Sequence, residues 1–141
     1  MIIWTVGHST RTVAELAAVV KAHGVEEIVD IRSIRRSRAN PQFNETRIAA
    51  ALGKRGVAYR IDEALGGRRG KAKRPPSLAN DAWENASFKN YADYALTAEF
   101  RAGLVALVRE ARKTPSAIMC AEAVWWRCHR RIVADHLIAR G

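Results

Sequence analysis

The chain has 141 residues, a length that fits one domain built on a single hydrophobic core. Hydrophobic residues make up 48% and charged residues 27%, which excludes a fibrous or largely disordered chain. No apolar run reaches the roughly 18 residues that a bilayer-spanning helix needs, and the N-terminus has no signal-peptide pattern. Two cysteines are too few for a disulfide scaffold. We therefore expect a cytoplasmic protein without a membrane partner.

The net charge is +10, and its source is local. The stretch from Arg32 to Arg74 holds 13 Lys and Arg against three acids, and the remaining residues hold 11 of each sign. Such a field attracts phosphate-bearing partners, including DNA or RNA. A basic loop that only aids solubility is the alternative, and the clustering favours anion binding.

The first half of the chain predicts three strands separated by two helices. Apolar, β-branched runs predict strands over 2–6, 28–31 and 57–61. Thr12 and Glu15 form a capping box in front of a helix that ends at Gly24. Asn44 is positioned to cap a second, shorter helix that Gly53 or Gly56 closes.

The second half begins with a segment of different composition. Residues 66–80 combine glycine, proline and charge without apolar periodicity, which predicts a basic, mobile loop. Helices follow around Phe88–Ala95 and Phe100–Ala111, then a strand over 116–119 and a helix over 127–140. Alternating strands and helices imply right-handed βαβ units and a mainly parallel sheet in a single α/β domain, 1–141. Because the chain stops after a helix, we also expect that a final strand follows residue 141.

Reactive side chains follow each predicted strand, and parallel strands bring their carboxyl ends to one edge. The four pairs are His8 and Ser9, Asp30 and Arg32, Asp62 and Glu63, and Cys120 and Glu122. Polar residues must end strands somewhere, but four ends with such groups predict a shared pocket.

Cys120 is the sharpest candidate for catalysis. A thiol at a strand end that faces a helix start can have its pKa lowered by the helix dipole and by cations, and would then be a nucleophile. A packed, inert thiol is the alternative. Cys120, Cys128 and His129 are also soft ligands for zinc or iron, but the two cysteines are eight residues apart and lack the paired spacing of most such sites.

Two segments are typical of anion recognition. His129 and Arg130 begin the last predicted helix, where backbone N–H groups favour a phosphate and His129 can act as a general acid. The extended segment after the second strand carries Arg32, Arg36, Arg38 and Asn40, and arginine favours shaped oxyanion binding. Trp125 and Trp126 are suited to stack on a base or to cover a core edge.

Several segments together resemble one known family. They are TVGHS (5–9), VDIRSIRRSRANPQFN (29–44), LGG (65–67), NASFKNYADY (85–94) and MCAEAVWWRCHRRIVADHLIARG (119–141). The chain resembles the domain of unknown function 488 family over essentially its whole length, although family members typically have a proline where Trp125 stands and usually continue past Gly141. The resemblance implies a three-layer Rossmann-like fold, with a mainly parallel sheet of four or five strands and helices on both faces, and implies no reaction.

The family's patterned polar positions largely coincide with those chosen from the strand ends. They fall on His8, Ser9, Asp30, Arg32, Arg36, Arg38, Asn40, Gly66, Gly67, Tyr91, Glu122, Cys128, His129 and Arg130, with Cys120 beside them. We therefore expect catalytic roles for Cys120, Glu122, His129 and His8. We expect anion binding by Ser9, Arg32, Arg36, Arg38, Asn40, Gly66, Gly67 and Arg130.

Three functions fit these patterns. The first is an enzyme acting on a phosphate-bearing substrate, nucleic acid or nucleotide, with no cofactor. The second is a non-catalytic nucleic-acid-binding module. The third is a rhodanese-like sulfur carrier that uses Cys120.

Overall fold

A computed structural model describes residues 1–69, 86–123 and 128–140. Within them, four strands form one sheet: β1 (Trp4–Gly7), β2 (Glu27–Asp30), β3 (Ala58–Ile61) and β4 (Ser116–Cys120). All pairs are parallel and the order is β1-β4-β2-β3. The predicted parallel sheet is confirmed. Most of the predicted mobile loop, residues 70–80, and the pair Trp125 and Trp126 lie outside the described residues.

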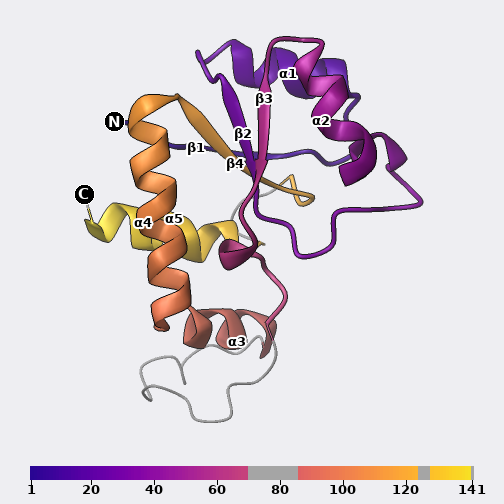
Figure 1. The fold of residues 1–141 in the computed structure, drawn as a ribbon. Coiled ribbons are helices and arrows are strands. Elements are labelled where there is room, and N and C mark those ends of the chain that lie inside the picture. Colours follow the sequence, from indigo (N-terminus) through magenta and orange to yellow (C-terminus); the bar gives the residue numbers. More distant parts are fainter. Residues whose placement is uncertain (70–85, 124–127, 141) are drawn as a thin grey trace.

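Helices cover both faces of the sheet, which gives the three layers of a Rossmann-like fold (Figure 1). Helices α1 (Val13–Lys21) and α2 (Glu45–Gly53) pack on one face, and α3 (Ala86–Tyr94), α4 (Ala98–Lys113) and α5 (Arg130–Arg140) on the other. Neighbouring strand residues point to opposite faces. Ile28 and Met119 therefore enter the core under α1 and α2, whereas Val29 and Ile118 enter the core under α4 and α5.

Local sequence signals explain where the first two helices begin. Thr12 and Glu15 form the predicted capping box in front of α1. The chain then turns at Gly24, whose φ of 76° is the left-handed conformation that glycine adopts without strain. Asn44 occupies the N-cap position of α2, but it makes no capping bond. Its Oδ1 instead accepts the N–H of Ser37 at 2.8 Å and so holds the segment that follows β2.

The topology opens a crevice at the carboxyl edge of the sheet. The chain leaves β1 and β2 for the face covered by α1 and α2, whereas it leaves β4 for α5 on the opposite face. Two short 3₁₀ turns, η1 (Pro41–Phe43) and η2 (Glu63–Leu65), stand beside this edge. Because β4 lies between β1 and β2, its connection diverges from both of theirs, which is where open α/β sheets bind ligands.

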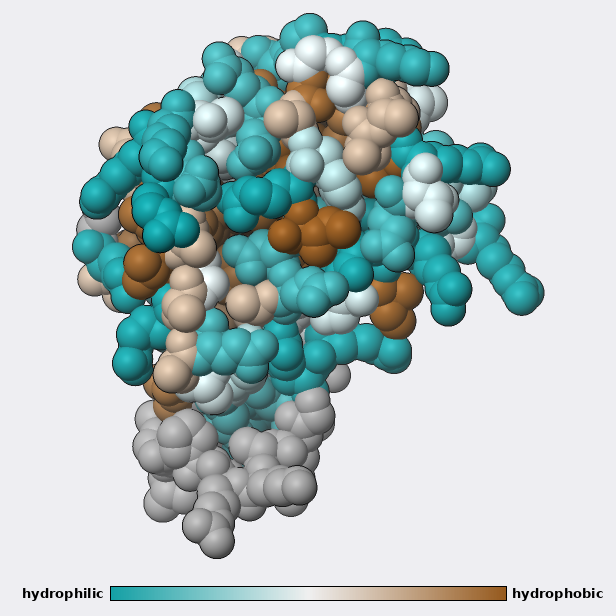
Figure 2. Space-filling model, in the orientation of Figure 1, coloured by the Kyte–Doolittle hydropathy of each residue, from teal (hydrophilic) through white to brown (hydrophobic). Residues whose placement is uncertain are grey.

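The surface in the orientation of Figure 1 is mostly hydrophilic. Figure 2 shows the hydrophobic residues of this face in small, separate groups among the hydrophilic ones. Among the described residues, no helix combines the length and the hydrophobicity needed to cross a bilayer.

Candidate functional site

Two adjoining pockets lie at the carboxyl edge of the sheet. The larger has a volume of about 340 Å³ and the smaller about 260 Å³. They share the lining residues Arg32, Ile34, Ala121 and Glu122. The register explains the convergence, since Gly7 pairs with Cys120 and Asp30 with Met119, so the residues after β1, β2 and β4 emerge together.

The sequence-predicted residues divide among these pockets. The larger one is lined by Arg32, Gly67, Cys120, Glu122 and His129, and the smaller by His8, Ser9, Arg32, Arg36, Asn40 and Glu122. Arg38, Gly66 and Arg130 line neither. The sequence argument missed Ser33, Ile34, Arg68, Phe88 and Ala121, which also line the larger pocket. Ile34, Phe88 and Ala121 are apolar and give no distinct signal in a single sequence, whereas Ser33 lies in the arginine segment and Arg68 in the basic loop that the sequence did single out. No observation tests the catalytic or anion-binding roles themselves, which stay predictions.

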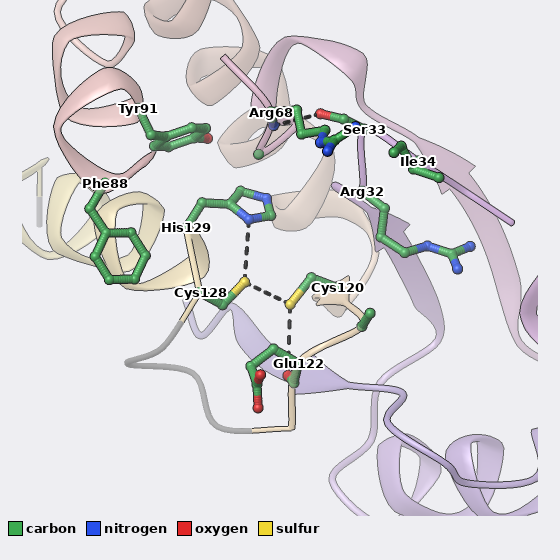
Figure 3. Close-up of a pocket in the computed structure, with 12 residues that line it drawn as sticks. Arg32, Ser33, Ile34, Arg68, Phe88, Tyr91, Cys120, Glu122, Cys128 and His129 are labelled. Atoms are coloured by element: carbon green, nitrogen blue, oxygen red, sulfur yellow. Dashed lines mark hydrogen bonds between the residues drawn. The ribbon is translucent and has the colours of Figure 1, made fainter. Parts of the chain in front are cut away.

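Two sulfurs and an imidazole meet in the larger pocket, and we call Cys120, Cys128 and His129 the cysteine cluster (Figure 3). Cys120 ends β4, and Cys128 lies just before α5. Both thiols are free and buried, and their Sγ atoms are 2.7 Å apart. Cys128 Sγ also lies 3.3 Å from Nδ1 of His129. The sequence argument named all three residues but placed the nucleophile on Cys120.

The orientation of the His129 ring follows from its second nitrogen. Nε2 lies 2.8 Å from the carbonyl oxygen of Ile31. A carbonyl can only accept a hydrogen bond, so Nε2 carries a hydrogen. Nδ1 is thereby left to exchange a proton with Cys128, as a catalytic base does with a nucleophile. The backbone just after β2 thus holds the ring in the orientation that faces the sulfur.

The surroundings of the two thiols move their pKa values in opposite directions. The pKa of Cys128 is lowered by the hydrogen bond from Cys120 and by His129, against the effect of burial. The backbone N–H of Arg130, at the N-terminus of α5, lies 3.5 Å from the same sulfur and adds to this. The pKa of Cys120 is raised by its bond to Cys128 and by burial. Of the two thiols, Cys128 is thus the more acidic, since it alone contacts His129 and the N–H of Arg130.

Neighbouring residues hold His129 in place. The ring of Tyr91 stands edge-on to it, with centroids 5.1 Å apart, and the Tyr91 hydroxyl donates to the carbonyl of Leu65 at 2.8 Å. Gly67 passes so close that a Cβ there would lie 2.5 Å from Nδ1. A side chain at Gly67 would displace the His129 ring, so close packing explains why this position holds a glycine. Gly66 is similarly confined, because a Cβ would lie 2.7 Å from Ser33 Oγ.

A second polar cluster, His8, Asp30 and Arg32, lies at the same edge, and we call it the Asp30 cluster. Arg32 binds both carboxylate oxygens of Asp30 at 2.7–3.0 Å, and its Nη2 also donates to the carbonyl of Phe43. Both side chains are buried, with exposed fractions of 5% and 0%. Tyr59 donates to the same carboxylate. The guanidinium that the sequence assigned to anion binding is thus largely occupied by Asp30.

His8 is bonded on both nitrogens. Nδ1 lies 2.9 Å from the carbonyl of Ser9 and therefore donates, while Nε2 accepts from Arg32 Nη1 at 3.3 Å. Burial lowers the pKa of His8, and the Arg32 charge lowers it further, against the bond to Ser9. The ring is thus neutral and its lone pair is engaged. This geometry favours a structural role for His8 over the predicted catalytic one.

The other three arginines that were predicted to bind anions lie in three different environments. Arg36 is exposed and lines the smaller pocket, where Ser9 adopts a left-handed φ of 47° beside it. Arg38 is exposed outside both pockets. Arg130 is buried, and its Nη2 donates to the carbonyl of Glu122, so it braces the segment after β4. Strained backbone is often found at ligand sites, which draws attention to Ser9.

The first residues of the predicted mobile loop are held in place. Arg68 is exposed at the larger pocket, and its N–H donates to Ser33 Oγ at 2.8 Å. Arg69 donates to the carbonyls of Glu63 and Gly66 and lies over the ring of Tyr94. Glu122 turns its carboxylate away from the sulfurs (Figure 3). The direction of the Glu122 side chain therefore does not support its predicted role in proton transfer.

The comparisons with known proteins identify the family. The model of the family described as "Domain of unknown function DUF488" matches residues 12–137, nearly the whole chain. The chain belongs to the DUF488 family. No curated protein and no solved structure matches it.

Among the described residues of the DUF488 chain, no group of three or more His, Cys, Asp or Glu side chains is arranged so that it could hold a metal ion. The candidate ligands Cys120, Cys128 and His129 do lie together, but the sulfurs are 2.7 Å apart. Two thiolates that each bind a tetrahedral Zn²⁺ at about 2.3 Å stand farther from one another than that. The cluster as it stands is arranged for proton exchange, and the sulfurs would have to separate to hold a metal.

Proposed function

We propose that this DUF488 protein is an enzyme that binds a small phosphate-bearing molecule, such as a nucleotide, and attacks it with Cys128. The observation that carries the proposal is the 3.3 Å contact between Cys128 Sγ and Nδ1 of His129, whose Nε2 is bonded to the carbonyl of Ile31. A nucleophile, a base and a group that orients the base are the parts of covalent catalysis.

The two pockets suggest how such a substrate lies. Arg36, Ser9 and Asn40 line the smaller pocket and offer a guanidinium, a hydroxyl and an amide to a phosphate. Arg68 offers a second exposed cation at the larger pocket. Because the pockets share four lining residues, a ligand can place its phosphate near Arg36 and its organic part near Cys128.

The chemistry follows from the softness of sulfur. A thiolate adds more readily to carbon than to phosphorus, so we infer that Cys128 attacks an electrophilic carbon of the organic part. The imidazolium of His129 then gives its Nδ1 proton to the leaving group. Water or a second substrate releases the product and restores the thiolate.

The test is alkylation of Cys128 by iodoacetamide at several pH values, followed by peptide mass spectrometry. An ordinary thiol with a pKa near 8.5 gains about 300-fold in thiolate between pH 5 and pH 7.5. We expect the rate at Cys128 to change less than about twofold, because its pKa is lowered, and the steep pH dependence to return in His129→Gln. Nucleoside monophosphates should slow the alkylation, about tenfold less effectively in Arg36→Met. Arg38→Met is the matched control, because Arg38 is exposed outside both pockets. A steep profile in the unmodified protein, or protection by no phosphate-bearing compound, would contradict the proposal.

The exposed arginines also support a second candidate, a nucleic-acid-binding module. Arg36 and Arg68 are exposed at the two adjoining pockets, and Arg38 is exposed two residues after Arg36. In that case an oligonucleotide binds with a log–log salt slope of about −0.9 per duplex phosphate contact, and Cys128→Ser leaves the binding unchanged.

A further inference from the structure

Cys120 forms no bond to the substrate in the reaction proposed above, yet it makes the shortest contact of the cysteine cluster. Its Sγ lies 2.7 Å from Cys128 Sγ and 3.7 Å from the carbonyl of Glu122. The two sulfurs come from different elements, a strand end and the start of a helix. Both side chains are buried, with exposed fractions of 3% and 8%, and both line the larger pocket. An inert packed thiol needs no such arrangement.

We propose that the two cysteines reduce a small hydroperoxide in the larger pocket, with Cys128 as the attacking and Cys120 as the resolving thiol. The Cys128 thiolate attacks the outer oxygen of the hydroperoxide, the O–O bond breaks, and the alkoxide takes the proton of the His129 imidazolium. This step leaves a sulfenic acid on Cys128 and an alcohol. The Cys120 thiol then attacks that sulfur, an S–S bond forms, and the hydroxyl leaves as water with the Cys120 proton. A dithiol small enough to enter the pocket then attacks this disulfide and leaves as its own cyclic disulfide, which returns Cys120 and Cys128 to thiols.

The geometry favours this second step. A disulfide has an S–S distance of about 2.05 Å, so the sulfurs need to approach by only about 0.7 Å. Cys120 is fixed by the sheet, since the N–H of His8 bonds to its carbonyl at 2.9 Å. Little movement is therefore needed, and the resolving thiol stands beside the sulfenic acid when it forms. A resolving thiol at this distance competes well with further oxidation of Cys128.

The burial of the sulfurs determines the size of the oxidant. A protein disulfide must reach the attacking sulfur in line, which buried side chains do not permit. A hydroperoxide needs only a cavity, and the larger pocket of about 340 Å³ leads to both sulfurs. Phe88, Ile34 and Ala121 give it apolar walls that suit an alkyl hydroperoxide as well as hydrogen peroxide. The Glu122 carboxylate, which points away from the sulfurs, does not repel the thiolate at close range (Figure 3).

This inference shares with the proposed function only the Cys128 thiolate and its His129 partner. The phosphate contacts of Arg36 play no part in it. Conversely, Cys120 forms and breaks no bond in the attack on a phosphate-bearing substrate, where it acts only through its hydrogen bond to Cys128. An experiment on Arg36 can therefore refute the proposed function alone, and an experiment on Cys120 can refute the hydroperoxide activity alone.

The experiment uses the full chain, reduced with dithiothreitol and then freed of it. One equivalent of hydrogen peroxide at pH 6 should remove two thiols and lower the mass by two hydrogens, with Cys120 and Cys128 joined in one peptide pair. Cys120→Ser should lose one thiol and carry a sulfenic acid on Cys128 that dimedone traps. Cys128→Ser should oxidise at least tenfold more slowly, because the remaining thiol is buried, which raises its pKa, and it is not the sulfur in contact with His129. Cys120→Ala serves in the same way if the serine variant does not fold, as judged by circular dichroism.

Three results overturn the proposal: a reduced protein that keeps both thiols, disulfides formed only between chains, or a Cys128 thiol that stays unoxidised in Cys120→Ser under the same treatment. If the internal disulfide forms but nucleoside monophosphates fail to protect Cys128, the proposed function alone is lost. If they protect Cys128 but no disulfide forms, the hydroperoxide activity alone is lost.

Discussion

The Asp30 cluster and the cysteine cluster lie at the same edge of the sheet, and each contains a histidine held by a backbone carbonyl. In the Asp30 cluster, Arg32 binds both oxygens of the carboxylate and still reaches His8 and the carbonyl of Phe43. Nearly every polar atom has a protein partner there. In the cysteine cluster, the sulfurs and the ring of His129 line a pocket. His8 and Arg32 also line a pocket, so the feature of the cysteine cluster that indicates chemistry is the contact of a thiol with a histidine nitrogen.

The largest expected effect is on the stability of the Asp30 cluster. Arg32→Met leaves the Asp30 carboxylate buried and without its ion-pair partner, so we expect the free energy of unfolding to fall by about 3–5 kcal/mol. Urea unfolding measures it. Arg36→Met is the matched control, because Arg36 is exposed and its loss should change stability by no more than about 0.5 kcal/mol. A loss below about 1 kcal/mol for Arg32→Met would mean that the ion pair is not structural.

A smaller effect is expected where the cysteine cluster meets Gly67. In Gly67→Ala the new Cβ would lie 2.5 Å from Nδ1 of His129, so the ring must move away from Cys128. We expect about tenfold slower alkylation of Cys128 at pH 5, together with a stability loss of about 1–3 kcal/mol. Gly53→Ala is the control, since a Cβ there meets nothing within 4 Å. Unchanged alkylation in Gly67→Ala would show that His129 does not activate Cys128.

The smallest effect concerns the protonation of His8. Burial lowers its pKa in the folded protein, so below pH 6.5 the unfolded chain binds a proton that the folded chain resists. The stability that neutral His8 contributes is thus complete above about pH 6.5 and declines as the pH falls through the lowered value. The stability advantage of the unmodified protein over His8→Gln should shrink by roughly 1 kcal/mol between pH 7.5 and 5.5. Urea unfolding at both values measures it, and an advantage that stays constant would show that His8 is not held neutral.

The fold followed closely from the sequence because its signals are local. Periodicity and the Thr12–Glu15 capping box placed α1, and β-branched runs placed all four strands to within about two residues. Asn44 is a case in which the local sequence signal predicts the position but not the hydrogen bond. It stands at the N-cap of α2 as expected, but its side chain bonds Ser37 instead of the helix. That bond depends on the path of the segment after β2, which helix propensity does not predict.

The sequence predicted where in the fold the site lies, but it did not predict the contacts between the site residues. The strand-end argument brought Cys120 and Arg32 to one edge, the helix-start argument named His129, and all three line the larger pocket. It did not contain the pairing of Arg32 with Asp30 or the contact of Cys128 with His129. Those contacts depend on side-chain directions across the sheet. The adjacent Cys128 and His129 at a predicted helix start were the available signal for a nucleophile other than Cys120.

The strand order carries a consequence for the timing of folding. β4, the fourth strand in the sequence, fills the gap between β1 and β2 and supplies Cys120 to the pocket. A nascent chain that has emerged only as far as β3 cannot yet pair β1 with its neighbour, and it has neither sulfur in place. The contact between the two sulfurs and His129 can therefore form only after these long-range pairings, which makes the cysteine cluster one of the last parts of the fold to assemble.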